Sequence, residues 1–304
     1  MKSAMRLRLF ENYRFVLYAP FYAAHAIGAY EREGLDVALL PSPGPGRAEQ
    51  ALIEGAAEFM WAGPLRVLQH HDNNPSSPLV CFAEIVCRDP FSIVGAKPNP
   101  QFTLADLARS RFACVSEVPT PWLCLQQDLR EAGIDPSRLD LAGSRGMAEN
   151  LALLRAGAID AAQFFEPFVE EAVTAAGLHL WYSASSRGRT SYTAFVTTRE
   201  RLRHMHEPLA AAVRAISRAQ HWVAAQTAAE IAAAIASFFP ALPRPLLTGA
   251  IARYQAQGVW GHDPILPEEG FARLQRALLA AGFIGRGIPF AACVDNGIAL
   301  GIAG

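Results

Sequence analysis

A polar and aromatic segment follows the first predicted strand, and its side chains suit the binding of a planar molecule. Asn12, Tyr13, Tyr18 and Tyr22 lie between positions 12 and 22. Tyrosine rings stack on planar ligands while their hydroxyl groups exchange hydrogen bonds. Ligands of open α/β sheets bind at the carboxyl ends of strands, so we expect these residues at a ligand site. The alternative is ordinary packing between two lobes.

A second candidate segment surrounds Pro64, because proline favours the first position of a helix. Trp61 and Gly63 precede this proline, and Arg66 follows it within the first helical turn. A guanidinium beside the unpaired N–H groups of a helix N-terminus binds a carboxylate, sulfonate or phosphate. A solvated arginine is the alternative for Arg66, and a core position is the alternative for Trp61.

The segment 116–122 has the pattern of a strand end, a stiff turn and a helix start, and it contributes Glu117, Thr120 and Trp122. Thr120 either caps its helix or offers its hydroxyl to an anion that Trp122 covers. Arg88 is followed by Asp89, so it either contacts a ligand or forms a salt bridge near a hinge.

Glu166 and Tyr192 complete the candidate set, each near the end of a predicted strand. The Glu166 carboxylate either caps the helix that begins at Pro167 or accepts N–H donors from a ligand such as an aminopyrimidine. If Arg66 and Glu166 face one cleft from opposite lobes, the ligand has an acidic end and an N–H donor end.

Residues that could hold a metal or perform catalysis do not form a recognisable pattern. His70, His71 and Asp72 are consecutive, so on a helix they point about 100° apart, and a solvated helix end is favoured over a metal site. The five cysteines form no CxxC pair, which indicates buried, inert thiols. No nucleophile-elbow, Walker or dinucleotide motif occurs, and no cofactor is expected.

The composition describes a chain that buries a large core without a charge surplus. Its 304 residues are 51% hydrophobic and 18% charged, a length that favours two lobes with a cleft between them. The 27 basic and 28 acidic residues give a net charge of -1, which disfavours nucleic acid as a partner. No apolar run approaches the roughly 20 residues of a bilayer span, and Arg6 and Arg8 interrupt any signal-like stretch at the start.

A β-α rhythm positions these candidate residues. Strands are expected at 5–9, 35–40, around Phe59, at 80–86, 111–116 and 161–165. Helices are expected at 21–33, 48–54, from 64, at 121–132, 147–156 and from 167, and then at 209–225, 228–238, 246–257 and 268–281. The tail after 282 has no regular pattern. This alternation predicts parallel sheets with helices on both faces.

A weak internal echo relates the two halves of the rhythm. The segments 52–58 and 154–160 each contain a helix end, a glycine, a small residue and an acid before a strand. Both strands lead to a proline that starts a helix, Pro64 and Pro167. Common helix signals explain such an echo equally well.

The segment YAAHAIGAYEREGLDV at 22–37 resembles the first helix and second strand of the SsuA/THI5-like (NMT1/THI5-like) solute-binding proteins. These proteins serve ABC importers of sulfonates, nitrate and thiamine pyrimidines. The likeness continues through the turn at 55–58, the helix at Asp106-Leu107, and 154–160 followed by Phe165-Glu166-Pro167, up to about Arg199.

The resemblance implies an α/β protein with the type II periplasmic-binding fold, two lobes and a ligand cleft between them. Residues 1–90 and 195–304 would form a discontinuous first lobe, and residues 91–194 the second. Hinges are expected near 88–94 and 192–197, where strands would pass between lobes that close around ligand.

Two enzyme branches share this fold, and the sequence departs from both. The thiamine pyrimidine synthases carry a cofactor-bearing lysine at the position of Ala62 and a donor histidine at that of Arg66, and their cysteine cluster is absent before Thr193. The biphenyl sulfinate desulfinases use a cysteine in the loop after the first strand, whereas residues 11–20 contain none.

Together with the candidate residues, the resemblance implies a monomeric binding protein, not an enzyme, that passes a small planar or anionic organic solute to an ABC permease. A sulfonate, a carboxylate or a pyrimidine would be such a solute. Neither nucleic acid nor membrane insertion is expected. An enzyme on the same scaffold and a cytosolic ligand sensor are the alternatives. The resemblance implies the periplasm, whereas the missing signal peptide and the five thiols favour the cytoplasm.

Overall fold

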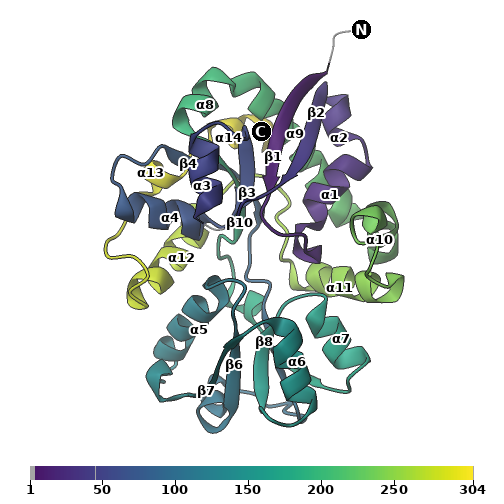
Figure 1. Cartoon of the computed structure of the whole chain (residues 1–304), viewed down its shortest axis with the longest axis vertical. Coiled ribbons are helices and arrows are strands. Elements are labelled where there is room, and N and C mark those ends of the chain that lie inside the picture. The colour runs from purple at the N-terminus through teal and green to yellow at the C-terminus, as the bar shows by residue number, and fades with distance from the viewer. Residues whose placement is uncertain (1–3, 45, 304) are drawn as a thin grey trace.

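The alternating stretch near the N-terminus forms the first strand of a computed structural model that describes residues 4–44 and 46–303. In this strand, β1 (Met5–Glu11), Leu7 and Leu9 are fully buried while Met5 is exposed. The described residues form two α/β lobes stacked along the long axis, each around a five-stranded sheet (Figure 1).

The first sheet has the order β2-β1-β3-β10-β4. Its other strands are β2 (Leu35–Pro41), β3 (Phe59–Ala62), β4 (Leu79–Val86) and β10 (Thr193–Thr198). Both β2 and β3 run parallel to β1, whereas β10 lies antiparallel between β3 and β4. The carboxyl ends of β1 and β3 therefore meet at one edge, where the segments after Glu11 and Ala62 begin.

The second sheet repeats this arrangement with the order β7-β6-β8-β5-β9. Its strands are β5 (Ser92–Gly95), β6 (Arg111–Val115), β7 (Asp140–Arg145), β8 (Ala161–Phe164) and β9 (His179–Ser183). Strand β5 lies antiparallel between β8 and β9, as β10 does between β3 and β4. The sequence echo at 52–58 and 154–160 precedes β3 and β8, which occupy the same place in their sheets.

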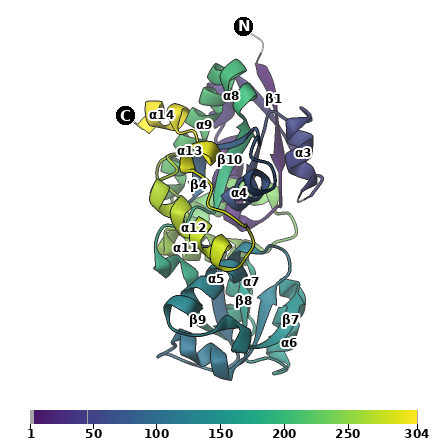
Figure 2. The same ribbon diagram turned by 90° about the vertical axis from the view of Figure 1, so that its left-hand side faces the viewer.

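Helices cover both faces of the first sheet. They are α1 (Ala19–Ala26), α2 (Ala29–Arg32), α3 (Arg47–Ile53), α4 (Pro64–Asn73), α8 (Arg199–His204), α9 (His206–Ala225), α10 (Ala228–Ile235), α11 (Arg244–Gln257), α12 (Glu268–Ala280), α13 (Phe290–Cys293) and α14 (Gly297–Ala303). Strand β3 shows why two layers form: Phe59 and Trp61 pack into the core with α1 and α9, and Met60 and Ala62 into the core with α4 and α12. Figure 2 shows the second layer, with α4, α12 and α13, facing the viewer.

The second lobe uses α5 (Thr120–Glu131) on one face of its sheet and α6 (Met147–Arg155) and α7 (Phe168–Thr174) on the other. Phe112 packs with Leu125 and Leu129 of α5, whereas Ala113 belongs to the core that contains Leu151 of α6. Alternation along β6 thus places a helix layer on each side.

Two segments connect the lobes and lie side by side. The first joins β4 to β5 through 87–91, and the second joins β9 to β10 through 184–192. The Thr190 N–H donates to the Cys87 carbonyl and the Tyr192 N–H to the Val86 carbonyl, both at 2.9 Å. The hinge expected at 192–197 stays a prediction, and in the structure the residues from Thr193 onward pair within the first sheet.

Four expectations differ from the structure. The sheets are not wholly parallel, because β10 and β5 each run antiparallel to both of their neighbours. The helix expected at 21–33 is divided into α1 and α2, because Gly28 adopts a left-handed conformation with φ of 67°. The tail after 282 forms α13 and α14 instead of staying irregular. His71 is buried, not solvated, and its Nε2 lies 2.9 Å from the Leu79 carbonyl oxygen.

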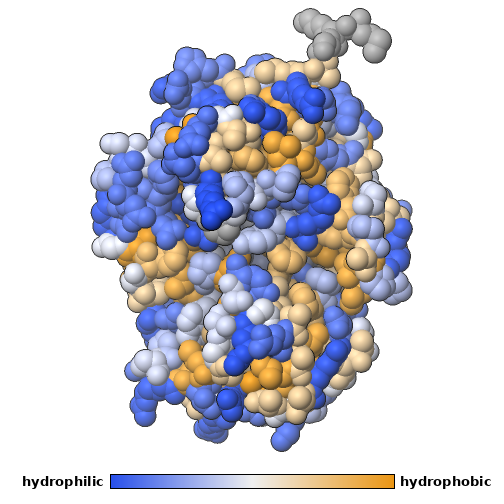
Figure 3. Space-filling model, viewed as in Figure 1, coloured by the Kyte–Doolittle hydropathy of each residue, from blue (hydrophilic) through white to orange (hydrophobic). Residues whose placement is uncertain are grey.

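The expected lobe boundaries at 90/91 and 194/195 stay a prediction about folding units, and the second of them falls inside β10. On the face seen in Figure 3, hydrophilic and hydrophobic residues are interspersed over both lobes. Within the described part of the chain, no helix combines the length and the apolar character that crossing a bilayer requires.

Candidate functional site

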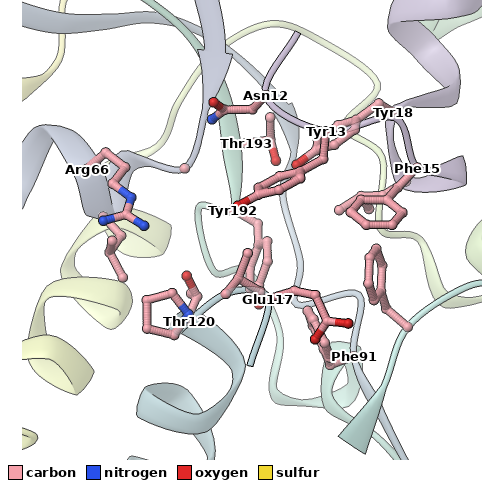
Figure 4. Close-up of a pocket in the computed structure, with 16 residues that line it drawn as sticks. Asn12, Tyr13, Phe15, Tyr18, Arg66, Phe91, Glu117, Thr120, Tyr192 and Thr193 are labelled. Carbon is pink, nitrogen blue, oxygen red and sulfur yellow. The ribbon is translucent and has the colours of Figure 1, made fainter. Parts of the chain in front are cut away.

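A pocket of about 680 Å³, counting its open mouth, lies between the two lobes where the connecting segments pass. Segments after β1, β3, β6 and β8 contribute to its walls, together with the two connections (Figure 4). The lining residues are Asn12, Tyr13, Phe15, Leu17, Tyr18, Gly63, Leu65, Arg66, Phe91, Glu117, Val118, Pro119, Thr120, Phe165, Tyr192 and Thr193.

Aromatic rings from both lobes form one side of the pocket. Phe165 contacts Phe15 edge to face, with 4.7 Å between ring centroids, and it lies 4.9 Å from Phe91. Tyr13 extends this set through Phe15 at 5.7 Å. Phe15 comes from the first lobe and Phe165 from the second, so this wall exists only while the lobes are together. Such rings favour a planar apolar body.

Two tyrosines line the pocket from more enclosed positions. Burial raises the pKa of Tyr18 and of Tyr192, so both phenols stay protonated at neutral pH. The Tyr192 hydroxyl is buried without a hydrogen-bond partner among the described residues. Tyr18 packs against Trp61 with 5.4 Å between ring centroids, which fixes its ring beside the core.

Arg66 lies in the first turn of α4 and has no carboxylate within ion-pair distance in the described residues. Its guanidinium donates to the Gln69 side chain at 3.1 Å. The residue before this helix is Gly63, which has no side chain, so no side chain of the N-cap residue pairs with the first N–H groups of α4. The approach of Gly63 to the second connection is close, because a Cβ there would lie 3.3 Å from the Tyr192 carbonyl oxygen.

A second uncapped helix N-terminus reaches the same pocket from the other lobe. Helix α5 begins at Thr120 with Pro119 before it, and no side chain caps its first turn. Figure 4 shows Arg66 and Thr120 on the same side of the pocket. Unpaired N–H groups, a hydroxyl and a guanidinium together form a favourable environment for an anion.

Glu117 occupies the other side of the pocket, near Phe91 and Phe15 in Figure 4. Its Oε1 accepts a hydrogen bond of 2.8 Å from the Met147 N–H, the first residue of α6. Its Oε2 is inaccessible to solvent and has no hydrogen-bond partner among the described residues. One oxygen of this carboxylate is thus used by the fold and the other is free.

Two aromatic residues expected at the site are placed in the core instead. Tyr22 is fully buried and donates a hydrogen bond to Glu11, which also forms an ion pair with Arg14 at 2.7 Å. Trp61 is fully buried and stacks on Phe21 with 4.5 Å between ring centroids. Both stabilise the wall behind Tyr18 without lining the pocket.

Three polar or amphipathic candidates also lie outside the pocket. Glu166 is buried against Arg253 of α11 in a 2.7 Å ion pair, and its Oε2 accepts from the Glu170 N–H. Burial raises its pKa to about 7, an effect that Arg253 opposes. Arg88 donates a hydrogen bond to the Ser185 carbonyl at 3.4 Å. Trp122 of α5 packs beside Phe112 of β6.

The remaining expected residues line the pocket: Asn12, Tyr13, Tyr18, Gly63, Arg66, Glu117, Thr120 and Tyr192. Other lining residues were not predicted, and most of them are apolar. The missed lining residues are Phe15, Leu17, Leu65, Phe91, Val118, Pro119, Phe165 and Thr193. All but Thr193 fall inside segments expected at strand ends. Their place in these loops was the only indication in the sequence. Which apolar residue of a loop faces the pocket and which faces the core is decided by the fold.

Groups typical of metal binding and nucleophilic catalysis are not gathered here. In residues 4–44 and 46–303, no three His, Cys, Asp or Glu side chains are arranged to hold a metal ion. All five cysteines are buried, and none of the described lining residues is a cysteine, histidine or lysine. The pocket combines aromatic residues, a side with Arg66 and two helix N-termini, and one carboxylate oxygen without a described hydrogen-bond partner.

Comparisons with known proteins place this geometry in context. The model of the family described as NMT1/THI5 like matches residues 17–229. YtlA of Bacillus subtilis (strain 168), whose name suggests a binding protein, is 24% identical over 300 residues, which cover 98% of this chain and 90% of YtlA.

Solved structures share the fold at low identity. The periplasmic aliphatic sulphonate binding protein SsuA from Escherichia coli is 17% identical with a TM-score of 0.75, over 94% of this chain and 96% of SsuA. The desulfurization enzyme DszB is 14% identical with a TM-score of 0.69, over 98% of this chain and 99% of DszB. The two-lobed architecture is thus the type II periplasmic-binding-protein fold.

Proposed function

Because the chain belongs to the NMT1/THI5-like family, we propose that it is a solute-binding protein whose lobes close around a small organic ligand for an ABC importer. One observation carries this proposal: the pocket is built from strand ends of both lobes, and two hydrogen-bonded connections pass beside it. Closing the lobes assembles the aromatic wall from Phe15 and Phe165. A ligand that contacts both sides stabilises that closed arrangement.

The pocket chemistry favours a planar aromatic or heteroaromatic solute, or an organic anion such as a sulfonate or carboxylate. On one side, the rings of Tyr13, Phe15, Phe91 and Phe165 pack together and can contact a planar ligand. On the other side, Arg66 and the N-termini of α4 and α5 attract negative charge. A pyrimidine would use the rings and the Glu117 side.

An enzyme of the desulfinase type on the same scaffold is the second candidate, and the placement of the thiols favours binding over it. Burial raises the pKa of Cys87 to about 11 and that of Cys114 and Cys124 to about 12. A thiol of this kind is a poor nucleophile at neutral pH, because the thiolate is the reactive form. None of these cysteines lines the pocket.

The partner and compartment follow from the same proposal. A binding protein of this fold delivers its solute to an ABC permease, and the E. coli neighbour is described as periplasmic. We therefore propose a periplasmic monomer, with the cytosolic ligand sensor as the alternative.

The test is native mass spectrometry of the purified protein, followed by calorimetry with benzenesulfonate, benzoate and a pyrimidine. Arg66→Met should reduce the affinity for an anionic ligand about ten- to a hundredfold, which is the loss expected for one hydrogen bond to a charged group. Arg109→Met is the matched control, because Arg109 is exposed and does not line the pocket.

Two results would contradict the proposal. If Arg66→Met and the parent bound every anionic ligand with equal affinity, the proposal that Arg66 binds the anionic group would be wrong. Conversion of the ligand over many turnovers, followed by mass analysis of the released product, would replace binding with catalysis.

A further inference from the structure

The free oxygen of Glu117 adds a second requirement to the ligand. The Glu117 carboxylate is held in place because Oε1 accepts from the first N–H of α6. Oε2 has neither solvent nor a described donor beside it. A buried acceptor without a donor is destabilising, so this oxygen is suited to an N–H or O–H group that arrives from outside the chain.

The neighbours of Glu117 define what carries that donor. In Figure 4 its carboxylate lies on the side of Phe15 and Phe91, whereas Arg66 and Thr120 lie across the pocket. Phe165 packs against both phenylalanines, with ring centroids 4.7 Å from Phe15 and 4.9 Å from Phe91. A donor attached directly to a planar ring would reach Glu117 while the ring occupies the aromatic wall.

We infer that the ligand is bifunctional: a planar ring whose amine, amidine or ring N–H donates to Glu117, with an acidic group at the opposite end beside Arg66 and Thr120. This inference rests on the proposed solute-binding function and narrows it to one polarity. The residue that accepts the hydrogen bond from the ligand is then Glu117 and not Glu166, because Glu166 pairs with Arg253.

Three small probes separate the two ends by calorimetry. 4-Aminobenzoate carries both groups, benzoate only the acid and aniline only the donor. The parent should bind 4-aminobenzoate about ten- to a hundredfold more tightly than benzoate, the gain of one hydrogen bond to a charged acceptor. Glu117→Gln should reduce that gain to about threefold or less while leaving benzoate within about threefold of the parent.

Glu149→Gln is the matched control for the effect of charge on α6. Glu149 lies in the first turn of the same helix, its side chain is 61% exposed, and it is absent from the pocket lining. It should leave all three affinities within about twofold. The melting temperature of ligand-free Glu117→Gln reports whether loss of the α6 contact, and not loss of the acceptor, explains any change.

The outcomes distinguish this inference from the proposed function. Equal affinities of the parent for benzoate and 4-aminobenzoate, or an equal loss of both in Glu117→Gln, would overturn the donor at Glu117 and leave solute binding intact. If no probe binds, the inference fails. A different small molecule retained in native mass spectrometry would then keep the binding function, whereas an empty protein would count against both.

Discussion

At the scale of single residues, Glu84 is a carboxyl group in an unfavourable place. It lies on β4, is 2% exposed, and its Oε1 has no hydrogen-bond partner among the described residues. Burial raises its pKa to about 8; Ser191 and Arg189 oppose this shift, and Asp263 adds to it. The group is therefore mostly protonated in the folded protein at neutral pH and ionised in the unfolded chain.

This difference predicts a pH dependence of stability. Between pH 5 and 8 the folded state binds a proton that the unfolded state has released, so the free energy of unfolding falls as pH rises, by up to about 1.4 kcal/mol per pH unit. Glu84→Gln should remove this loss, and urea unfolding at pH 5 and pH 8 measures it. Exposed Glu131→Gln should change both values equally. A pH profile of Glu84→Gln that parallels the parent would mean that Glu84 is ionised in the fold.

Individual site residues were predictable from sequence only as far as the loop that carries them. Tyr13 and Tyr22 belong to the same aromatic segment, yet Tyr13 lines the pocket and Tyr22 is buried on Glu11. Glu166 looked free because its partner, Arg253, lies on a helix far along the chain. Such long-range pairings leave no local pattern, since the sequence gives periodicity but not the neighbour across an interface.

At the scale of elements, the contact of α11 with α7 holds the lobes together on one side of the pocket. Arg253 forms ion pairs with Glu166 and Glu170, and the Glu166 N–H donates to the Tyr254 hydroxyl at 3.0 Å. Gln257 adds a hydrogen bond of 3.1 Å to Ser183. Opening the lobes at this edge would break these contacts, so they favour the closed arrangement before ligand arrives.

Arg253→Met should therefore weaken ligand binding although Arg253 does not line the pocket. We expect a several-fold loss of affinity and a larger radius of gyration without ligand, because less of the protein is in the closed form. Small-angle scattering and calorimetry measure the two effects. Arg218→Met is the control, because it breaks a 3.1 Å ion pair with Glu33 within one lobe. An unchanged radius with unchanged affinity would show that α11 and α7 do not govern closure.

Most helices and strands were predictable because their boundaries are marked locally. Helix α4 begins at Pro64 as expected, and Gly133 follows the end of α5. The strands β5, β7, β9 and β10 and the helix α8 were not among the elements expected from the local pattern. Two other exceptions have identifiable causes. Gly28 divides a helix that its periodicity makes continuous, and α13 and α14 are short segments that bury Cys293, Ile298 and Ala299 while they contact β4 and α9. Tertiary contacts decide such segments, and local propensity does not.

At the scale of the whole molecule, the proposed function requires ligand to stabilise the fold. Ligand that binds the closed native state and not the unfolded chain raises the free energy of unfolding, by about 2.7 kcal/mol at a hundred times Kd. The melting temperature should therefore rise with ligand concentration in a thermal-shift titration. Arg66→Met should need a higher concentration for the same rise, whereas Arg109→Met should follow the parent. An unchanged melting temperature at saturating ligand would rule out preferential binding to the native state.

The central place of β10 also bears on the order in which the chain can fold as it leaves the ribosome. The first sheet needs a strand between β3 and β4, and that strand begins only at Thr193. Strands β5 to β9, by contrast, form a complete sheet from residues 92–183. During synthesis the second sheet can therefore form first, because the first sheet still lacks the strand that pairs with both β3 and β4. Nascent chains usually fold from the N-terminal domain onward. Here the lobe that begins the chain is the last to be completed. Until β10 is synthesised, β3 and β4 are unpaired sheet edges, which can pair with other chains and cause aggregation.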